Sequence, residues 1–328
     1  MKQENERSLV SVVVPTYNRA VMVCDALQSV KNQSYRPLQL LVVDDGSTDD
    51  TGDVVKKWAD ENAKDDFEVR YLWQENQGGN PARNHGIAEA EGEFVAFLDS
   101  DDLWDSEKLK QQVELFIEDS RVGAVYCGVR HVDAATGKVL ESTKRNYPAG
   151  DILCQILVRD VTSPTSAYIV KRELFGKVGD FDITLQARQD WDMWIRLAAE
   201  CRIGSLPSAL VEYREHTGTR TASDPNKEIN AYARIMEKYK VLRGKQPLGV
   251  RCAAKGSYFK RMGRVHFHQG ISTSKAILYL TRSVLVWPFD FDAWAALAGM
   301  LLPRGIRRLI HRTWNGMFGA TKLAIRSH

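Results

Sequence analysis

The chain has 328 residues, of which 44% are hydrophobic and 27% are charged, a composition that excludes disordered and fibrous proteins. The formal net charge of +3 conceals two differently charged regions: residues 226–328 hold 19 Lys and Arg against 4 Asp and Glu, and residues 1–225 hold 26 against 38. We therefore predict two domains, 1–225 and a basic, helical 226–328 that suits an anionic surface or an oligomer contact.

Short apolar runs alternate with helical patterns through the first region. The runs cover 9–14, 38–43, 69–73, 94–98 and 122–127, and the helical patterns cover 20–32, 50–63, 80–90 and 106–118. Continuous Val, Ile and Leu runs joined by helices are typical of parallel strands that are covered on both faces. We therefore predict a doubly wound α/β sheet, which binds ligands beyond the carboxyl ends of its strands.

Polar motifs follow three of these runs. PTYNR follows the first, DDGSTD the second and DSDD the fourth. The last motif places Asp99, Asp101 and Asp102 within four positions, where their repulsion must be offset by a cation. A strand-end turn with a helix cap is the other interpretation, and Asp102 would then be the cap.

Four blocks in this order carry a family resemblance: SVVVPTYNR, LLVVDDGSTD, ENQGGNPARNHGIAEAEGEFVAFLDSDD and RQDWDMWIRLA. Together they resemble the family 2 glycosyltransferases of the GT-A fold, and four ordered blocks are far more specific than any one. The resemblance implies that 1–225 is a catalytic domain with a GT-A type, Rossmann-like, mostly parallel sheet and helices on both faces. It also implies an inverting transfer of a sugar from a nucleoside-diphosphate donor.

The resemblance also implies roles for individual residues. Asp99 and Asp101 match the D-x-D positions that hold Mn²⁺ or Mg²⁺ against the donor's diphosphate, with Asp101 the expected direct ligand. Tyr17 is expected to stack on the base, Asp45 to accept from its N3–H, and Asp44 to support the loop. The expected substrate-binding residues are Pro15, Thr16, Tyr17, Asn18, Arg19, Asp45, Arg83, Asn84, Asp99 and Ser100.

Three further expectations concern loops and helix starts. Arg83 and Asn84 are expected to open a helix whose N-terminus faces the diphosphate. The other interpretation of DDGSTD is a strand-to-helix turn with Ser47 or Thr48 as the helix cap, a role that is compatible with binding. His216 is expected either as a third metal ligand or as an exposed loop histidine, and both interpretations stay open.

Asp190 is the expected catalytic base. An inverting transfer needs a carboxylate on the acceptor side, and the resemblance places Asp190 there. The family commonly has Glu-Asp at this point, so Gln189 removes a neighbouring charge from the base. A helix-cap role alone is the other interpretation of Asp190, and Asp192 is expected on the solvated face of the helix.

The expected activity is non-processive, because the chain has no Q-x-x-R-W motif. The expected donor is a UDP-sugar, and the acceptor is a carbohydrate or a lipid-linked glycan in polysaccharide, glycolipid or glycoprotein assembly, with no nucleic-acid partner. A sugar-nucleotide nucleotidyltransferase is the first alternative, although it would need a G-x-G-x-R loop where PTYNR stands. A catalytically silent carbohydrate-binding module is the second.

The cysteines and the C-terminal segment indicate where in the cell the protein is expected. Five scattered cysteines, an N-terminus without an apolar leader and no long apolar stretch favour a cytoplasmic chain. A helix from about 302 would place Leu302, Ile306 and Leu309 on one face and arginines on the other, which suits peripheral contact with an anionic membrane. Packing on the protein's own helices or on a second subunit of a homo-oligomer is equally consistent with this pattern.

Overall fold

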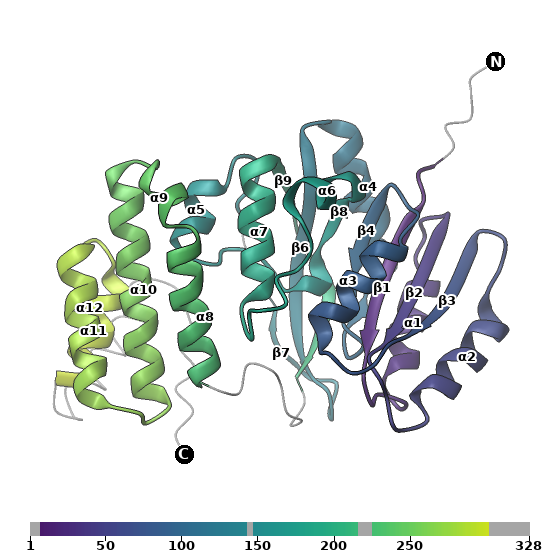
Figure 1. The fold of residues 1–328 in the computed structure, drawn as a ribbon, viewed down its shortest axis with the longest axis horizontal. Coiled ribbons are helices and arrows are strands. Elements are labelled where there is room, and N and C mark those ends of the chain that lie inside the picture. Colours follow the sequence, from purple (N-terminus) through teal and green to yellow (C-terminus); the bar gives the residue numbers. More distant parts are fainter. Residues whose placement is uncertain (1–6, 143–146, 216–224, 302–328) are drawn as a thin grey trace. The chain divides into compact units, whose positions relative to one another are not determined.

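The computed structural model describes residues 7–142, 147–215 and 225–301 (Figure 1). It divides into two compact units, with the division between Lys238 and Tyr239. This point is later than the 225/226 boundary expected from the charge distribution. His216 and the helix expected from about 302 lie outside the described residues.

The first unit is built on one mixed sheet, with strand order β3–β2–β1–β4–β8–β6–β9–β5 and with β7 paired to β6. The strands are β1 (Val10–Thr16), β2 (Leu38–Asp44), β3 (Phe67–Trp73), β4 (Phe94–Phe97), β5 (Leu103–Trp104), β6 (Val122–Asp133), β7 (Val139–Ser142), β8 (Ile169–Lys171) and β9 (Arg202–Glu215). The helices are α1 (Val23–Lys31), α2 (Thr51–Asn62), α3 (Gly79–Glu89), α4 (Lys108–Glu118), α5 (Leu153–Val158), α6 (Phe175–Val178), α7 (Gln189–Glu200) and α8 (Pro225–Lys238).

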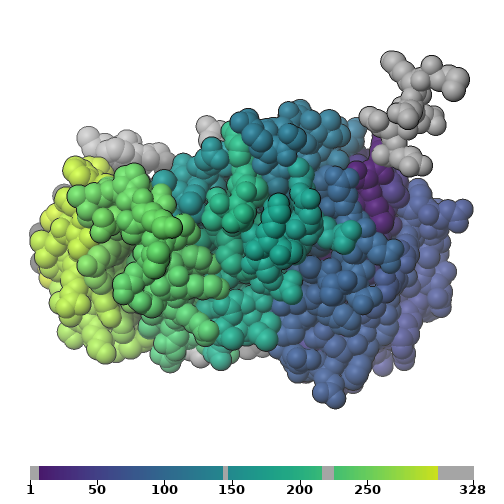
Figure 2. All heavy atoms as spheres, turned by 45° about the horizontal axis from the view of Figure 1, so that its top comes forward, coloured from purple at the N-terminus to yellow at the C-terminus, as the bar shows by residue number. Residues whose placement is uncertain are grey.

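The first four apolar runs form the predicted parallel strands. β1 is parallel to both of its neighbours, with Val10 opposite Leu38 on β2 and Phe94 on β4. Every residue of β1 and β2 is buried, as continuous apolar runs require. In the space-filling view the purple area at the surface is small, and it comes from the described residues that precede β1 (Figure 2).

The fifth run has different neighbours from those expected in a simple doubly wound sheet. β6 pairs antiparallel with β8 and parallel with β9. β8 enters between β4 and β6 and is antiparallel to both. A strand of three residues leaves no periodic pattern in a sequence, so its insertion could not be predicted.

Helix α3 approaches β1 unusually closely. A β-carbon on Gly86 would lie 2.3 Å from Cγ1 of Val13, so only glycine fits at this contact. The close approach fixes the height of α3 over the sheet and, with it, the positions of Arg83 and Asn84.

Helix α7 packs as predicted through Trp191 and Trp194, which are both buried. The ring of Trp194 stacks on Tyr168 with centroids 3.5 Å apart. The expectation for Asp192 was wrong, because its side chain is fully buried and pairs with Arg196 at 3.0 Å and with Lys238 at 2.7 Å. Lys238 belongs to α8, and a cation supplied from so far along the chain is not visible in the local pattern.

The second unit is helical, as predicted. Its described helices are α9 (Lys240–Gly244), α10 (Leu248–His268), α11 (Thr273–Val286) and α12 (Phe291–Leu301). A β-carbon on Gly263 of α10 would lie 2.8 Å from Cγ of Leu280, so α10 and α11 are in close contact. Across the described residues, no helix combines the length and the apolar character that a membrane span requires.

Candidate active site

The loops after β1 and β2 are joined to each other. The backbone N–H of Asn18 donates to Oγ of Ser47 at 2.9 Å, and Oδ1 of Asn18 accepts from the backbone N–H of Thr48 at 2.8 Å. Asn18 has a φ of 51°, a left-handed conformation that asparagine tolerates. The alternative interpretation, in which Ser47 or Thr48 caps α2, was wrong, because α2 begins only at Thr51 and both residues bind Asn18 instead.

The first motif divides into a buried part and an exposed part. Pro15 and Thr16 are strand residues that lie opposite Val43 and Asp44. Within the described part of the chain, the buried hydroxyl of Thr16 has no hydrogen-bond partner. Tyr17 follows directly and is 46% exposed, so its ring is available for stacking on a base.

Asp44 supports the loop, as predicted. Its Oδ1 accepts from the backbone N–H of Ser47 at 2.8 Å, and its Oδ2 accepts from the hydroxyl of Tyr71 at 2.7 Å. Burial and this hydrogen bond to Asp44 raise the pKa of Tyr71. The tyrosine therefore stays a neutral donor to the carboxylate.

Asp45 is nearly buried and receives three hydrogen bonds from the segment before α3. They come from the side chain of Gln74 at 2.7 Å and from the backbone N–H groups of Gln77 at 3.0 Å and Gly78 at 2.7 Å. In this arrangement Asp45 holds the β3–α3 loop against β2. A base N–H that reached Asp45 would share the carboxylate with these donors.

Arginines from two other segments meet the acidic cluster after β4. Arg83 of α3 forms an ion pair with Asp99, and Arg19 lies 3.8 Å from Asp101. Ser100, between the two aspartates, is 7% exposed. The positive charge that offsets the repulsion between these carboxylates therefore comes partly from two arginines of the protein itself.

Asp102 is buried beneath this cluster. It accepts from the hydroxyl of Ser166 at 2.6 Å and from the backbone N–H of Arg214 at 3.3 Å. Burial and the carboxylates of Asp99 and Asp101 raise the pKa of Asp102 well above its usual range. The helix-cap interpretation was wrong, because α4 begins only at Lys108 and Asp102 holds other parts of the chain.

Arg83 and Asn84 lie in the second turn of α3, which begins at Gly79. The guanidinium of Arg83 lies over the ring of Phe181 at 5.9 Å. The side-chain amide of Asn84 donates to the backbone carbonyl of Phe181 and accepts from its N–H, both at 2.9 Å. Asn84 therefore fixes the segment before α7, and Arg83 is the one of the two that faces Asp99.

Asp190 lies in the first turn of α7. Its Oδ1 accepts from the backbone N–H of Trp191 at 2.8 Å. Arg188, with a φ of 59°, precedes it and forms an ion pair with Glu228 of α8 at 2.7 Å. The ion pair between Arg188 and Glu228 thus connects the start of α7 to α8.

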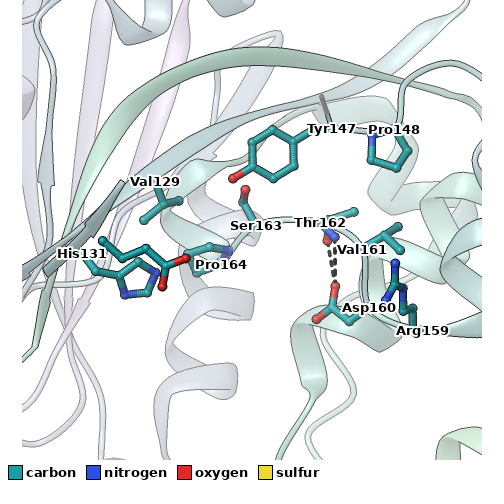
Figure 3. A pocket seen from close by; sticks show the side chains of 11 residues that line it. Val129, His131, Tyr147, Pro148, Arg159, Asp160, Val161, Thr162, Ser163 and Pro164 are labelled. Atoms are coloured by element: carbon teal, nitrogen blue, oxygen red, sulfur yellow. Dashed lines mark hydrogen bonds between the residues drawn. The ribbon is translucent and has the colours of Figure 1, made fainter. Parts of the chain in front are cut away.

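Asp160 is a residue of this region that the sequence analysis missed. Its carboxylate accepts from the backbone N–H of Thr162 at 3.2 Å and from its hydroxyl at 3.0 Å, and it lies 3.8 Å from Arg188 (Figure 3). Burial, and then the neighbouring carboxylate of Asp190, raise the pKa of Asp160 to about 6. A second carboxylate therefore stands beside Asp190 although position 189 is Gln.

The acidic cluster fits a divalent ion that is shared with a substrate. Asp99 and Asp101 remain 29% and 21% exposed, and carboxylate oxygens are the ligands that Mg²⁺ and Mn²⁺ prefer. Among the residues that the structure describes, no set of three or more His, Cys, Asp and Glu side chains could hold a metal. Mg²⁺ sites of this kind use one or two carboxylates and complete the shell with phosphate and water.

Comparisons with known proteins show the family and the fold of the chain. Residues 11–176 match the family described as "Glycosyl transferase family 2". An uncharacterized glycosyltransferase of Rickettsia felis is 31% identical over 230 residues, which are 69% of this chain and 36% of that protein. The match thus spans little more than a third of that relative's length.

Two solved structures share the fold. S. aureus TarS 1–349, in complex with UDP-GlcNAc, has a TM-score of 0.64 and 22% identity, covering 93% of this chain and 92% of that chain. Mannosyltransferase PcManGT from Pyrobaculum calidifontis, in complex with GDP-Man and Mn²⁺, has a TM-score of 0.60 and 23% identity, covering 95% and 84%. These similarities confirm the predicted GT-A type α/β fold.

Proposed function

Because the chain belongs to glycosyl transferase family 2, we propose that it transfers a sugar from a nucleoside-diphosphate donor to an acceptor hydroxyl. The observation that carries this proposal is the pairing of Asp99 with Arg83 and of Asp101 with Arg19 at one edge of the sheet. The edge combines carboxylates for a shared ion with guanidiniums for phosphate oxygens.

The proposed donor is a UDP-sugar that is bound with Mn²⁺ or Mg²⁺. The two solved structures of the same fold support this class of ligand, since one holds UDP-GlcNAc and the other GDP-Man with Mn²⁺. Asp101 and Asp99 would hold the ion, and His216 is proposed as a further ligand. The ion would supply positive charge to the departing diphosphate. Tyr17 would stack on the base.

The proposed reaction is a single inverting displacement. Asp190 takes the proton of the acceptor hydroxyl, whose oxygen forms a bond to the anomeric carbon. The bond from that carbon to the diphosphate oxygen breaks on the opposite face, and the nucleoside diphosphate leaves with the electron pair. Arg83 stabilises the negative charge that develops on the leaving group.

The proposed acceptor is a carbohydrate or a lipid-linked glycan. We also propose a cytoplasmic setting, which the free state of all five cysteines supports. Peripheral contact between the basic C-terminal region and an anionic membrane surface would bring a lipid-linked acceptor to the site.

A donor screen tests the proposal. The purified chain is incubated with UDP-, GDP- and dTDP-sugars and Mn²⁺, and nucleoside diphosphate release is followed. Release supports a transferase. Exchange of pyrophosphate into the donor would indicate a nucleotidyltransferase, and binding without turnover would indicate a carbohydrate-binding module.

A further inference from the structure

A pocket of about 480 Å³ opens beside Asp160. Its walls come from β6, β7 and the segments 147–148 and 159–164 (Figure 3). This volume lies within the range of small-molecule sites. None of the residues that line the pocket belongs to the expected donor site.

One wall is an aromatic ring on a fixed backbone. The hydroxyl of Ser205 donates to the carbonyl of Tyr147 at 3.1 Å, and the hydroxyl of Tyr126 donates to the carbonyl of Pro148 at 2.7 Å. The rings of Tyr126 and Tyr147 meet edge to face, with centroids 5.4 Å apart. Tyr147 is therefore positioned before any ligand arrives.

The opposite wall carries polar groups that are themselves held in place. Thr162 donates twice to Asp160, and the hydroxyl of Ser163 donates to the carbonyl of Cys127 at 2.7 Å. In Figure 3 the hydroxyl ends of Tyr147 and Ser163 point toward each other across the pocket. An aromatic face opposite fixed carboxylate and hydroxyl groups suits a sugar ring, which has apolar C–H faces and polar edges.

The position of the pocket follows from the segment 160–166. At its start, Asp160 lies 3.8 Å from Arg188, which is two residues before Asp190. Near its end, Ser166 accepts from the backbone N–H of Asp99 at 3.1 Å and donates to Asp102. The segment thus connects the proposed base to the proposed diphosphate side, and the pocket opens at the base end.

We propose that this pocket is the acceptor subsite, which takes a carbohydrate whose ring stacks on Tyr147 and whose hydroxyl binds the carboxyl group of Asp160. The inference rests on the proposed function and names the acceptor class for the same site. Asp160 would hold a hydroxyl that neighbours the one from which Asp190 takes the proton. It is a positioning residue of the acceptor.

Direct binding tests this subsite without knowledge of the natural acceptor. The probes are methyl glycosides of glucose, galactose, N-acetylglucosamine and N-acetylgalactosamine, observed by saturation-transfer NMR on the full chain. The wild type is expected to bind at least one probe. Tyr147→Ala and Asp160→Asn are each expected to weaken that binding about tenfold, from the loss of a stacked ring or of a charge-assisted hydrogen bond.

Two further variants serve as controls for this binding test. Tyr147→Phe retains the ring and is expected to retain binding, which separates stacking from a folding defect. Asp151→Asn removes an exposed carboxylate that follows Pro148 by three residues but lies outside the pocket lining, and it is expected to behave as the wild type. Thermal unfolding of each variant confirms that it is folded.

The outcomes separate this inference from the proposed function. If the wild type binds none of the probes, or if Tyr147→Ala and Asp160→Asn bind like the wild type, the acceptor subsite is wrong, whether or not the donor is turned over. If the donor screen shows no turnover but the probes bind and the two variants lose binding, the pocket is a carbohydrate site and the transferase proposal is wrong.

Discussion

Arg83 on α3 forms an ion pair with Asp99 after the end of β4, so this guanidinium and the first carboxylate of the acidic cluster hold each other in place. Replacing Arg83 with Gln leaves Asp99 without this partner and removes the guanidinium that we propose for binding the diphosphate. We expect UDP to bind roughly tenfold more weakly, from the loss of charge-assisted hydrogen bonds. Calorimetry with UDP measures this change, and unchanged affinity would place the diphosphate elsewhere.

The substitution Asp101→Ala tests the proposed metal site. Because the side chain is partly exposed at the end of a strand, the fold should survive. We expect turnover to be lost, together with the rise in donor affinity that Mn²⁺ produces. Asp105→Ala, an exposed carboxylate nearby, is the matched control. If Asp101→Ala keeps its response to Mn²⁺, the ion binds at another site.

The substitution Asp190→Asn tests the base. The amide keeps the size of the side chain and its acceptor oxygen for the N–H of Trp191 but cannot take a proton. Donor binding should persist while transfer falls by at least about 10²-fold, the usual contribution of a general base. Single-turnover kinetics separate the two effects. Transfer close to that of the wild type would exclude Asp190 from this role.

Asp160 should make the stability of the fold depend on pH. Its pKa of about 6 lies above the ordinary value of 3.8, so the folded state binds its proton more tightly than the unfolded state. The contribution of Asp160 to stability therefore falls as the pH rises from about 4 to about 6. Asp160→Asn cannot ionise and should be more stable than the wild type at pH 8 by up to about 3 kcal/mol, with the difference vanishing near pH 4.

Asp182 provides a control for this experiment, because folding lowers its pKa whereas folding raises the pKa of Asp160. Burial opposes ionisation of Asp182, but hydrogen bonds from Lys238 and Thr184 lower its pKa to about 2. Asp182→Asn should therefore be less stable than the wild type at pH 7, with the deficit disappearing as the pH falls toward 2. Urea unfolding across this range measures both variants. A difference between Asp160→Asn and the wild type that is constant from pH 4 to 8 would contradict the argument for Asp160.

The parts of the molecule that the sequence predicted are those governed by local patterns. The runs that became β1, β2 and β4 are mostly apolar and are buried throughout, because both faces of the sheet are covered. The motifs that follow them lie at one edge, because the strands are parallel. Asp44 supports its loop as expected, through contacts with a nearby residue and with the adjacent strand β3.

The parts that the sequence could not predict depend on segments far away along the chain. Asp102 looked like a helix cap because its partners, Ser166 and Arg214, lie in later segments. Asp192 looked solvated because Lys238 comes from α8. Asp160 carried no motif, and only folding places it beside Asp190. A polar cluster such as RDVTSPTS between apolar runs was the available signal for a functional loop.

The segment 160–166 also bears on how specificity could diverge within such a fold. The strands β1, β2 and β4, which precede the motifs of the proposed donor site, contribute no residue to the lining of the pocket beside Tyr147. Substitutions on β6, β7 and around Tyr147 could therefore reshape the proposed acceptor pocket while the proposed donor site stays intact. In a protein with this arrangement, specificity for the acceptor can evolve while specificity for the donor is retained.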